Sequence, residues 1–205
     1  MAEERKKIAK KTWREKRWYE VVAPPIFAGR VIGETPALEP SQLVGRVFET
    51  TLGDLIDDFS KSHIKLYFQI KETDGNRAIT AFSGHEMVRD YVRSLVRRRS
   101  SKVEDITRVR TKDGYLVKLC AMATTLRSIQ STKLTMLRMD MREVMRSKAA
   151  EKKLDEFVLE MVLGKLSADI YKRCKKYCPI HKVEVYKSEV LSGPSPEVSK
   201  SDVAA

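Results

Sequence analysis

The chain has 205 residues, and its 40 Lys and Arg outnumber its 28 Asp and Glu, which gives a formal net charge of +12. An apolar content of 42% supports a buried core, so wholesale disorder is excluded. No apolar run approaches the length that spans a bilayer, and the first residues lack the apolar core of a secretory signal. Three cysteines are too few for a disulfide framework, so the sequence predicts a soluble protein of the cytoplasm or nucleus.

The two ends of the chain differ in composition from the middle. Residues 1–17 form a basic arm with little apolar surface, so we expect only weak order there without a partner. Residues 192–205 are rich in Ser and Pro and predict a disordered tail. Residues 18–191 are expected to form a single domain.

Two predicted hairpins dominate this middle part. Residues 64–70 alternate apolar and polar side chains, and Asp74-Gly75 is a typical turn before a returning strand at 77–83. A second hairpin is expected around Asp113-Gly114, between strands at 103–111 and 115–123. Further strands are expected at 18–22, 44–50 and 181–191. Residues 29–43, rich in Gly and Pro, predict an irregular excursion.

Apolar residues at helical spacing predict helices at 86–98, 128–149, 154–163 and 166–177, with a break at Gly164. The fold class is therefore α+β. The two hairpins favour an antiparallel, barrel-like sheet with flanking amphipathic helices.

Arginines recur at helical spacing on two of these helices, as Arg89, Arg93 and Arg97 and as Arg138, Arg142 and Arg146. One such stripe alone is more often a solvated helix face that pairs with nearby acids. Two stripes together with the basic arm favour nucleic acid over an anionic membrane surface. The predicted RNA-binding residues are Arg5, Lys6, Lys7, Lys10, Lys11, Trp13, Arg14, Lys16, Arg17, Arg93, Arg97, Arg98, Arg99, Lys102, Lys133, Arg138, Arg142 and Arg146.

Aromatic residues lie within and beside the arm. Trp13, Trp18 and Tyr19 together resemble a platform on which unpaired bases stack. For Trp18 and Tyr19 we favour a role as core anchors that open the first strand, and for Trp13 both interpretations stay open.

A possible zinc site and a possible catalytic centre are both weakly supported. Cys174, Cys178 and His181 have a ligand-like spacing, but zinc takes four ligands and Cys120 lies within a predicted strand. We therefore expect no metal and no cofactor, and two buried thiols in place of zinc ligands.

Asp54, Asp57 and Asp58 could hold a divalent ion, yet such a run is more typical of a helix N-terminus. His63 and His85 lie on different elements with no evident Ser or Cys nucleophile. The sequence therefore does not predict an enzyme.

Several short motifs follow one another along the chain. They are Trp18–Pro24 with Phe27, Gly45–Glu49 with Leu52 and Asp54-Leu55, Phe82–His85 with Arg89-Asp90, Thr111–Leu116, Arg138–Met145 and Tyr177–His181. This ordered set resembles the archaeal and eukaryotic small-subunit ribosomal protein family called S-three-a-e, or eS-one, from about residue 12 to about residue 190. The short C-terminal tail of the chain is similar to the archaeal form.

This resemblance implies a non-enzymatic, cytoplasmic, ribosome-bound protein on the platform of the small subunit. It implies contacts with ribosomal RNA and neighbouring platform proteins, with messenger RNA nearby and no membrane. It also implies an α+β fold around a barrel-like sheet. Two alternatives remain, a protein-interaction module whose helices from 130 to 177 dock partner helices, and a metal-dependent RNA-processing factor that uses the aspartates at 54, 57 and 58.

Overall fold

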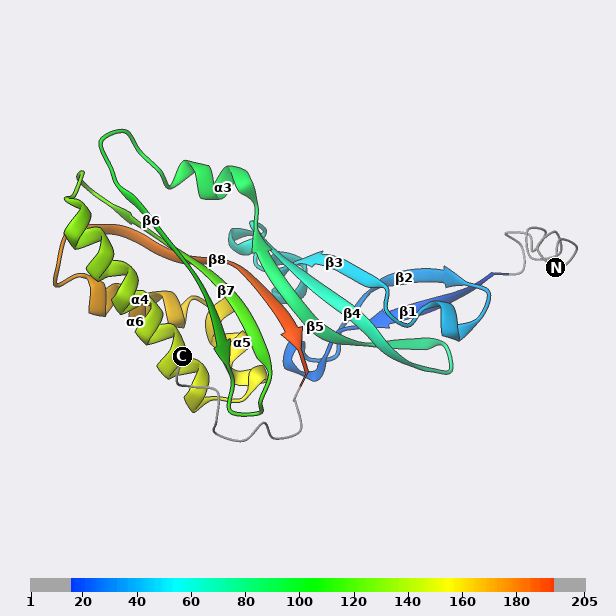
Figure 1. Ribbon diagram of the computed structural model, residues 1–205. Coiled ribbons are helices and arrows are strands. Elements are labelled where there is room, and N and C mark those ends of the chain that lie inside the picture. The colour runs from blue at the N-terminus through cyan, green and yellow to red at the C-terminus, as the bar shows by residue number, and fades with distance from the viewer. Residues whose placement is uncertain (1–15, 194–205) are drawn as a thin grey trace, which may run out of the picture. The chain divides into compact units, whose positions relative to one another are not determined.

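The computed structural model describes residues 16–193, which form a mixed α+β protein as predicted (Figure 1). The contacts divide the chain into two compact units. The first comprises the described residues up to Thr50 together with Tyr67–Phe82, and the second comprises Thr51–Leu66 and the chain from Ser83 onward. Residues 194–205 of the predicted tail at 192–205, and seven predicted contacts, lie outside the described residues. These contacts are Arg5, Lys6, Lys7, Lys10, Lys11, Trp13 and Arg14.

Eight strands are found in residues 16–193. They are β1 Arg17–Val22, β2 Val31–Ala37, β3 Val47–Thr51, β4 Ile64–Asp74, β5 Arg77–Met87, β6 Lys102–Arg110, β7 Leu116–Thr125 and β8 Ile180–Ser192. The strand order is β2-β1-β5-β8-β7-β6, and β4 pairs with both β3 and β5. Both hairpins are confirmed, and each turn glycine has a positive φ, +56° at Gly75 and +83° at Gly114.

The predicted barrel-like antiparallel sheet is wrong in two respects. Strand β1 runs parallel to β5, with Glu20, Val21 and Val22 opposite residues 77–79. The two strands that end the strand order, β2 and β6, each pair on one side only within the described chain, so the sheet is open. A barrel needs these two edges to pair with each other.

The helices are α2 Leu52–Ile56, α3 Arg89–Ser94, α4 Ser131–Glu151, α5 Leu154–Val162 and α6 Lys165–Cys174. Short 3-10 helices occur at Pro25–Phe27 (η2), Pro40–Gln42 (η3) and Phe59–Lys61 (η4). The last three α-helices agree closely with the prediction, and Gly164 separates α5 from α6 with a φ of +83°.

The first unit is built on β1 and its neighbours. Tyr19 and Val21 are buried in a small core, but Trp18 on the opposite face is 51% exposed, so its predicted role as a core anchor is wrong. Residues 31–37, predicted to be irregular, form β2 along β1. Pro36 is tolerated there because β2 is an edge strand and its outer side needs no amide donor.

The second unit packs α4, α5 and α6 against one face of β6, β7 and β8 (Figure 1). Strand β6 alternates strictly between exposed and buried residues, and its buried face meets α4. The largest fully buried side chains of the three helices are Phe157, Leu137, Met141, Met145 and Leu166. This layer of helix on sheet positions the basic residues considered next.

Candidate RNA-binding surface

The first arginine-rich segment is a turn and not a long helix. Strand β5 continues to Met87 because its residues 84–86 pair with β8, so α3 covers only Arg89–Ser94. The predicted helix at 86–98, with arginines aligned along one face, is therefore wrong. Arg97, Arg98 and Arg99 instead form an exposed turn between α3 and β6, which we call the basic turn.

Hydrogen bonds close the basic turn. The Ser100 hydroxyl donates to the Arg97 carbonyl oxygen at 2.5 Å, and the Arg97 amide donates to the same hydroxyl oxygen at 3.2 Å. Arg99 adopts a left-handed φ of +60°, which turns the chain sharply at that residue. Three consecutive guanidinium groups are thereby exposed on a short segment whose backbone is held in place.

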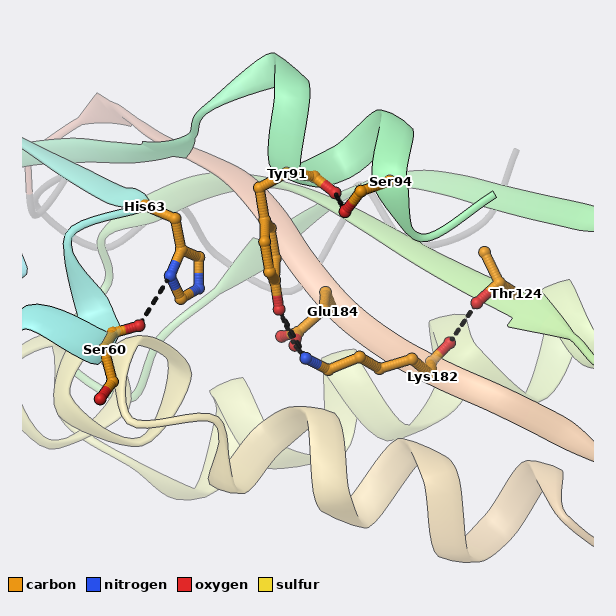
Figure 2. Close-up of polar contacts among 7 residues, drawn as sticks. All are labelled: Ser60, His63, Tyr91, Ser94, Thr124, Lys182 and Glu184. Atoms are coloured by element: carbon orange, nitrogen blue, oxygen red, sulfur yellow. Dashed lines mark hydrogen bonds and ion pairs between the residues drawn. The ribbon is translucent and has the colours of Figure 1, made fainter. Parts of the chain in front are cut away.

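Tyr91 anchors the helix that precedes the basic turn. Its ring lies against the His63 ring, with centroids 3.9 Å apart (Figure 2). Its hydroxyl donates to Glu184 at 3.3 Å and accepts from the Lys182 ammonium at 2.5 Å. The Ser94 hydroxyl donates to the Tyr91 carbonyl oxygen at 2.7 Å. These contacts fix α3, which is too short to be stable without them.

The predicted cations differ in whether a carboxylate already neutralises them. Arg93 and the basic turn are exposed, and within residues 16–193 none of these four arginines makes an ion pair. Lys133, Arg138 and Arg146 on α4 are also exposed and, in the same part of the chain, have no carboxylate partner. A cation without a carboxylate partner can bind a phosphate oxygen without first breaking an ion pair.

Two predicted cations are engaged internally. Arg142 reaches from α4 to the buried Asp105 on β6, where its Nη2 donates to the carboxylate at 2.6 Å. The Thr107 hydroxyl donates to the same carboxylate at 2.5 Å. The hydrogen bonds to Asp105 raise the pKa of Arg142. Arg142 therefore links α4 to β6, in addition to any contact with RNA. The second engaged cation is Lys102, which forms an ion pair with Glu104.

The basic turn lies next to the segment that leads into α4. The Ser101 hydroxyl accepts a hydrogen bond from the Ile129 amide at 3.1 Å, and Ser101 also exchanges bonds with Thr125. Arg127 lies in this segment, is exposed, and has no ion pair within the described residues. Sequence reasoning missed Arg127 because it is an isolated cation in a loop with no periodic signal.

The three residues considered as zinc ligands do not form a metal site. Cys174 and Cys178 are buried, as expected for small apolar side chains. Burial raises the pKa of Cys174 to about 11 and also raises that of Cys178, which opposes the thiolate form that binds metal. No group of three or more His, Cys, Asp or Glu in residues 16–193 is placed to hold a metal ion.

The prediction that the aspartates after Gly53 lie at a helix N-terminus is confirmed for Asp54 and Asp58, whereas Asp57 is the C-cap of α2. Thr51 caps α2 by accepting from the Asp54 amide at 3.2 Å, and its hydroxyl donates to the Asp54 carboxylate at 2.6 Å. Asp58 caps η4 by accepting from the Ser60 amide at 3.1 Å. Hydrogen bonding from the side chain of Ser60, together with this amide bond, lowers the pKa of Asp58. These roles are those of caps and not of metal ligands.

His85 is buried between β5 and β8. Its Nε2 donates to the Val185 carbonyl oxygen at 2.9 Å, so its Nδ1 accepts from the Ser188 hydroxyl at 2.6 Å. Burial lowers the pKa of His85 to about 4. The neutral, fully bonded ring joins two strands about a hundred residues apart and has no exposed nitrogen for catalysis.

None of the helices in residues 16–193 combines the length and the apolar character needed to cross a membrane.

Comparison with known proteins gives the family. The model of the Ribosomal S3Ae family matches residues 4–194. A protein named small ribosomal subunit protein eS1 from Staphylothermus marinus is 47% identical over 203 residues, which cover 99% of this chain and 96% of that protein. The proteins of the same name from Desulfurococcus amylolyticus and Aeropyrum pernix are each 46% identical, over 99% and 90% of this chain and 95% and 88% of their own lengths. The chain therefore belongs to the Ribosomal S3Ae family, as its motifs indicated.

Proposed function

We propose that this protein is a structural constituent of the small ribosomal subunit, where it binds ribosomal RNA on the platform near the messenger exit and supports translation. The names of its relatives support the assignment to the small subunit. In this role its partners are small-subunit ribosomal RNA and neighbouring platform proteins, with messenger RNA nearby. It works ribosome-bound in the cytoplasm and without enzymatic activity.

The observation that carries the RNA-binding part of this proposal is the basic turn. Its three arginines are exposed, consecutive and without an ion pair in residues 16–193, on a backbone closed by Ser100 and anchored through Tyr91. Arginine presents a planar fork that matches phosphate oxygens, and a rigid segment loses little entropy on binding. Arg93, Lys133, Arg138 and Arg146 extend this set.

Sedimentation of a cell extract on a sucrose gradient tests the proposal. We expect the protein to sediment with the small subunit and to stay there through a moderate salt wash, because folded RNA and protein neighbours hold it together. Extract treated with ribonuclease is the control, in which the peak should be lost. Protein at the top of the untreated gradient would contradict the proposal and favour a free RNA-processing role.

A further inference from the structure

Two exposed methionines lie in the middle of α4, a helix whose other face packs against the sheet (Figure 1). Met139 is 65% exposed and Met136 is 44% exposed, whereas Leu137 and Met141 of the same helix are fully buried. Side chains three positions apart are neighbours on a helix surface, so the two methionines lie side by side. We call Met136 and Met139 the methionine pair. Its apolar surface interrupts a helix face that is otherwise almost entirely polar.

Cations flank the methionine pair on both sides. Arg138 and Arg142, four residues apart, lie on the flank next to β6, where Arg142 reaches the Asp105 carboxylate at 2.6 Å. The opposite flank lies next to α6 and contains Asp140 and, about two helical turns before it, Lys133. Within residues 16–193, neither Arg138 nor Lys133 has a carboxylate partner. Each flank therefore has an exposed cation that can bind an anionic group.

The carboxylates near the methionine pair are already neutralised by α6. The Asp140 carboxylate lies 3.1 Å from the Lys176 Nζ. Arg173 lies 3.7 Å from the same carboxylate and also pairs with Glu143. The remaining acid of α4, Glu151, ends the helix about 18 Å beyond the methionine pair. The surroundings of the methionine pair therefore have a net positive charge, which complements an anionic partner.

The side chains along this face favour an RNA duplex over a partner helix. A docking helix is held by apolar anchors spread over about two turns, but here the stripe continues with Thr132 before the methionine pair and with Glu143 and Arg146 after it. The minor groove of an A-form RNA duplex is wide and shallow, and proteins bind it through its shape, its 2′-hydroxyls and the phosphates on either side. A helix with an apolar centre and a cation on each flank matches that groove.

We propose that α4 binds the minor groove of a double-stranded segment of ribosomal RNA. The methionine pair packs against ribose carbons within the groove, and Arg138 and Lys133 bind phosphates on its two sides. Methionine suits this contact because its flexible side chain adapts to an irregular surface. The inference rests on the proposed function and specifies it, since it names paired RNA as the partner of α4 and adds two apolar residues to the basic ones.

Directed hydroxyl-radical cleavage from position 139 tests this inference. The three native cysteines are buried, so the exposed thiol of Met139→Cys is the one that an iron–EDTA reagent labels. Small subunits stripped of the protein by salt are rebuilt with the labelled full chain, and the RNA cuts are mapped. We expect cuts in both strands of one RNA duplex. The wild-type chain treated with the same reagent is the control and should give no cuts there.

The other outcomes of this experiment contradict the inference. Cuts confined to unpaired RNA would overturn it, and so would the absence of RNA cuts in subunits that contain the labelled chain, which would indicate that a protein and not RNA covers α4. Both of these results leave the proposed function intact. Failure of the labelled and the wild-type chain alike to enter the subunits would overturn both.

Substitution provides an independent measurement. Dissociation constants of the full chain are determined for an RNA duplex of about 16 base pairs, a DNA duplex of the same sequence and one RNA strand alone. We expect Met136→Ala with Met139→Ala to weaken binding of the RNA duplex about tenfold. Binding of the single strand and of DNA, whose minor groove is too narrow for a helix, should not change.

A matched double variant controls for the loss of exposed apolar surface. Ile106→Ala with Leu163→Ala removes side chains that are 59% and 44% exposed on β6 and just after α5, and it should bind all three nucleic acids like the wild type. An equal loss on all three nucleic acids by the methionine variant, or no loss on the RNA duplex, would overturn the inference.

Discussion

Removing the basic turn should weaken RNA binding in a way that depends on salt. In the triple variant Arg97→Ala, Arg98→Ala and Arg99→Ala, three exposed charges without ion pairs in the described chain are lost. If each guanidinium contacts one phosphate, the slope of log K against log salt becomes shallower by about 2 to 3. Between about 50 and 200 mM salt, the wild type then loses roughly 30-fold more affinity than the variant.

The fold should survive this change. All three side chains are exposed, and Ala and Arg bear similar strain at the left-handed φ of residue 99, so circular dichroism and the melting temperature should not move. The assay is filter binding of the full chain to small-subunit ribosomal RNA over a salt series. A matched variant removes three exposed lysines on or beside α5 and α6, Lys153, Lys165 and Lys175, and should keep the wild-type slope. Equal slopes for the two variants would refute the argument.

Three further substitutions test the internal contacts. Arg142→Ala leaves a buried carboxylate without its cation and should lower the free energy of unfolding in urea by about 2 kcal/mol, whereas the unpaired Arg138→Ala should change it by under about 0.5 kcal/mol. The pKa of His85 falls from 6.5 to about 4 on folding, because burial disfavours the charged ring. The free energy of unfolding should therefore drop by about 3 kcal/mol as the pH is lowered from 6.5 to about 4. His85→Gln should flatten this dependence, and an unchanged pH profile would contradict it. Gly84→Ala places a Cβ against a backbone carbonyl of β8 and should cost about 1–3 kcal/mol in thermal melts, whereas the roomier Gly193→Ala should melt like the wild type.

Short stretches of sequence predicted the elements whose structure is decided by residues that are close together along the chain. The turns at Asp74-Gly75 and Asp113-Gly114 fix their hairpins because glycine accepts a positive φ. The three C-terminal helices follow from apolar spacing and from the break at Gly164. The N-caps Thr51 and Asp58 likewise depend on contacts within three residues, Thr51 with Asp54 and Asp58 with Ser60.

The errors arose where distant strands decide the structure. Residues 86–98 have helical spacing, but pairing of Gly84, His85 and Glu86 with β8 extends the strand instead. Trp18 and Tyr19 are both plausible core residues, and only the phase of β1 decides which of them is buried. The partner of Arg142 could not be predicted, because Asp105 is 37 positions away and an aspartate is not expected on the buried face of a strand.

The position of β8 has a consequence for biosynthesis. This strand is the last in the described chain, yet it lies between β5 and β7. While the ribosome is still making the helices that precede it, the facing edges of β5 and β7 have backbone groups with no strand between them. The second unit therefore cannot complete its sheet until residues 180–192 have left the exit tunnel, and a nascent chain halted before that point carries two open edges that invite aggregation.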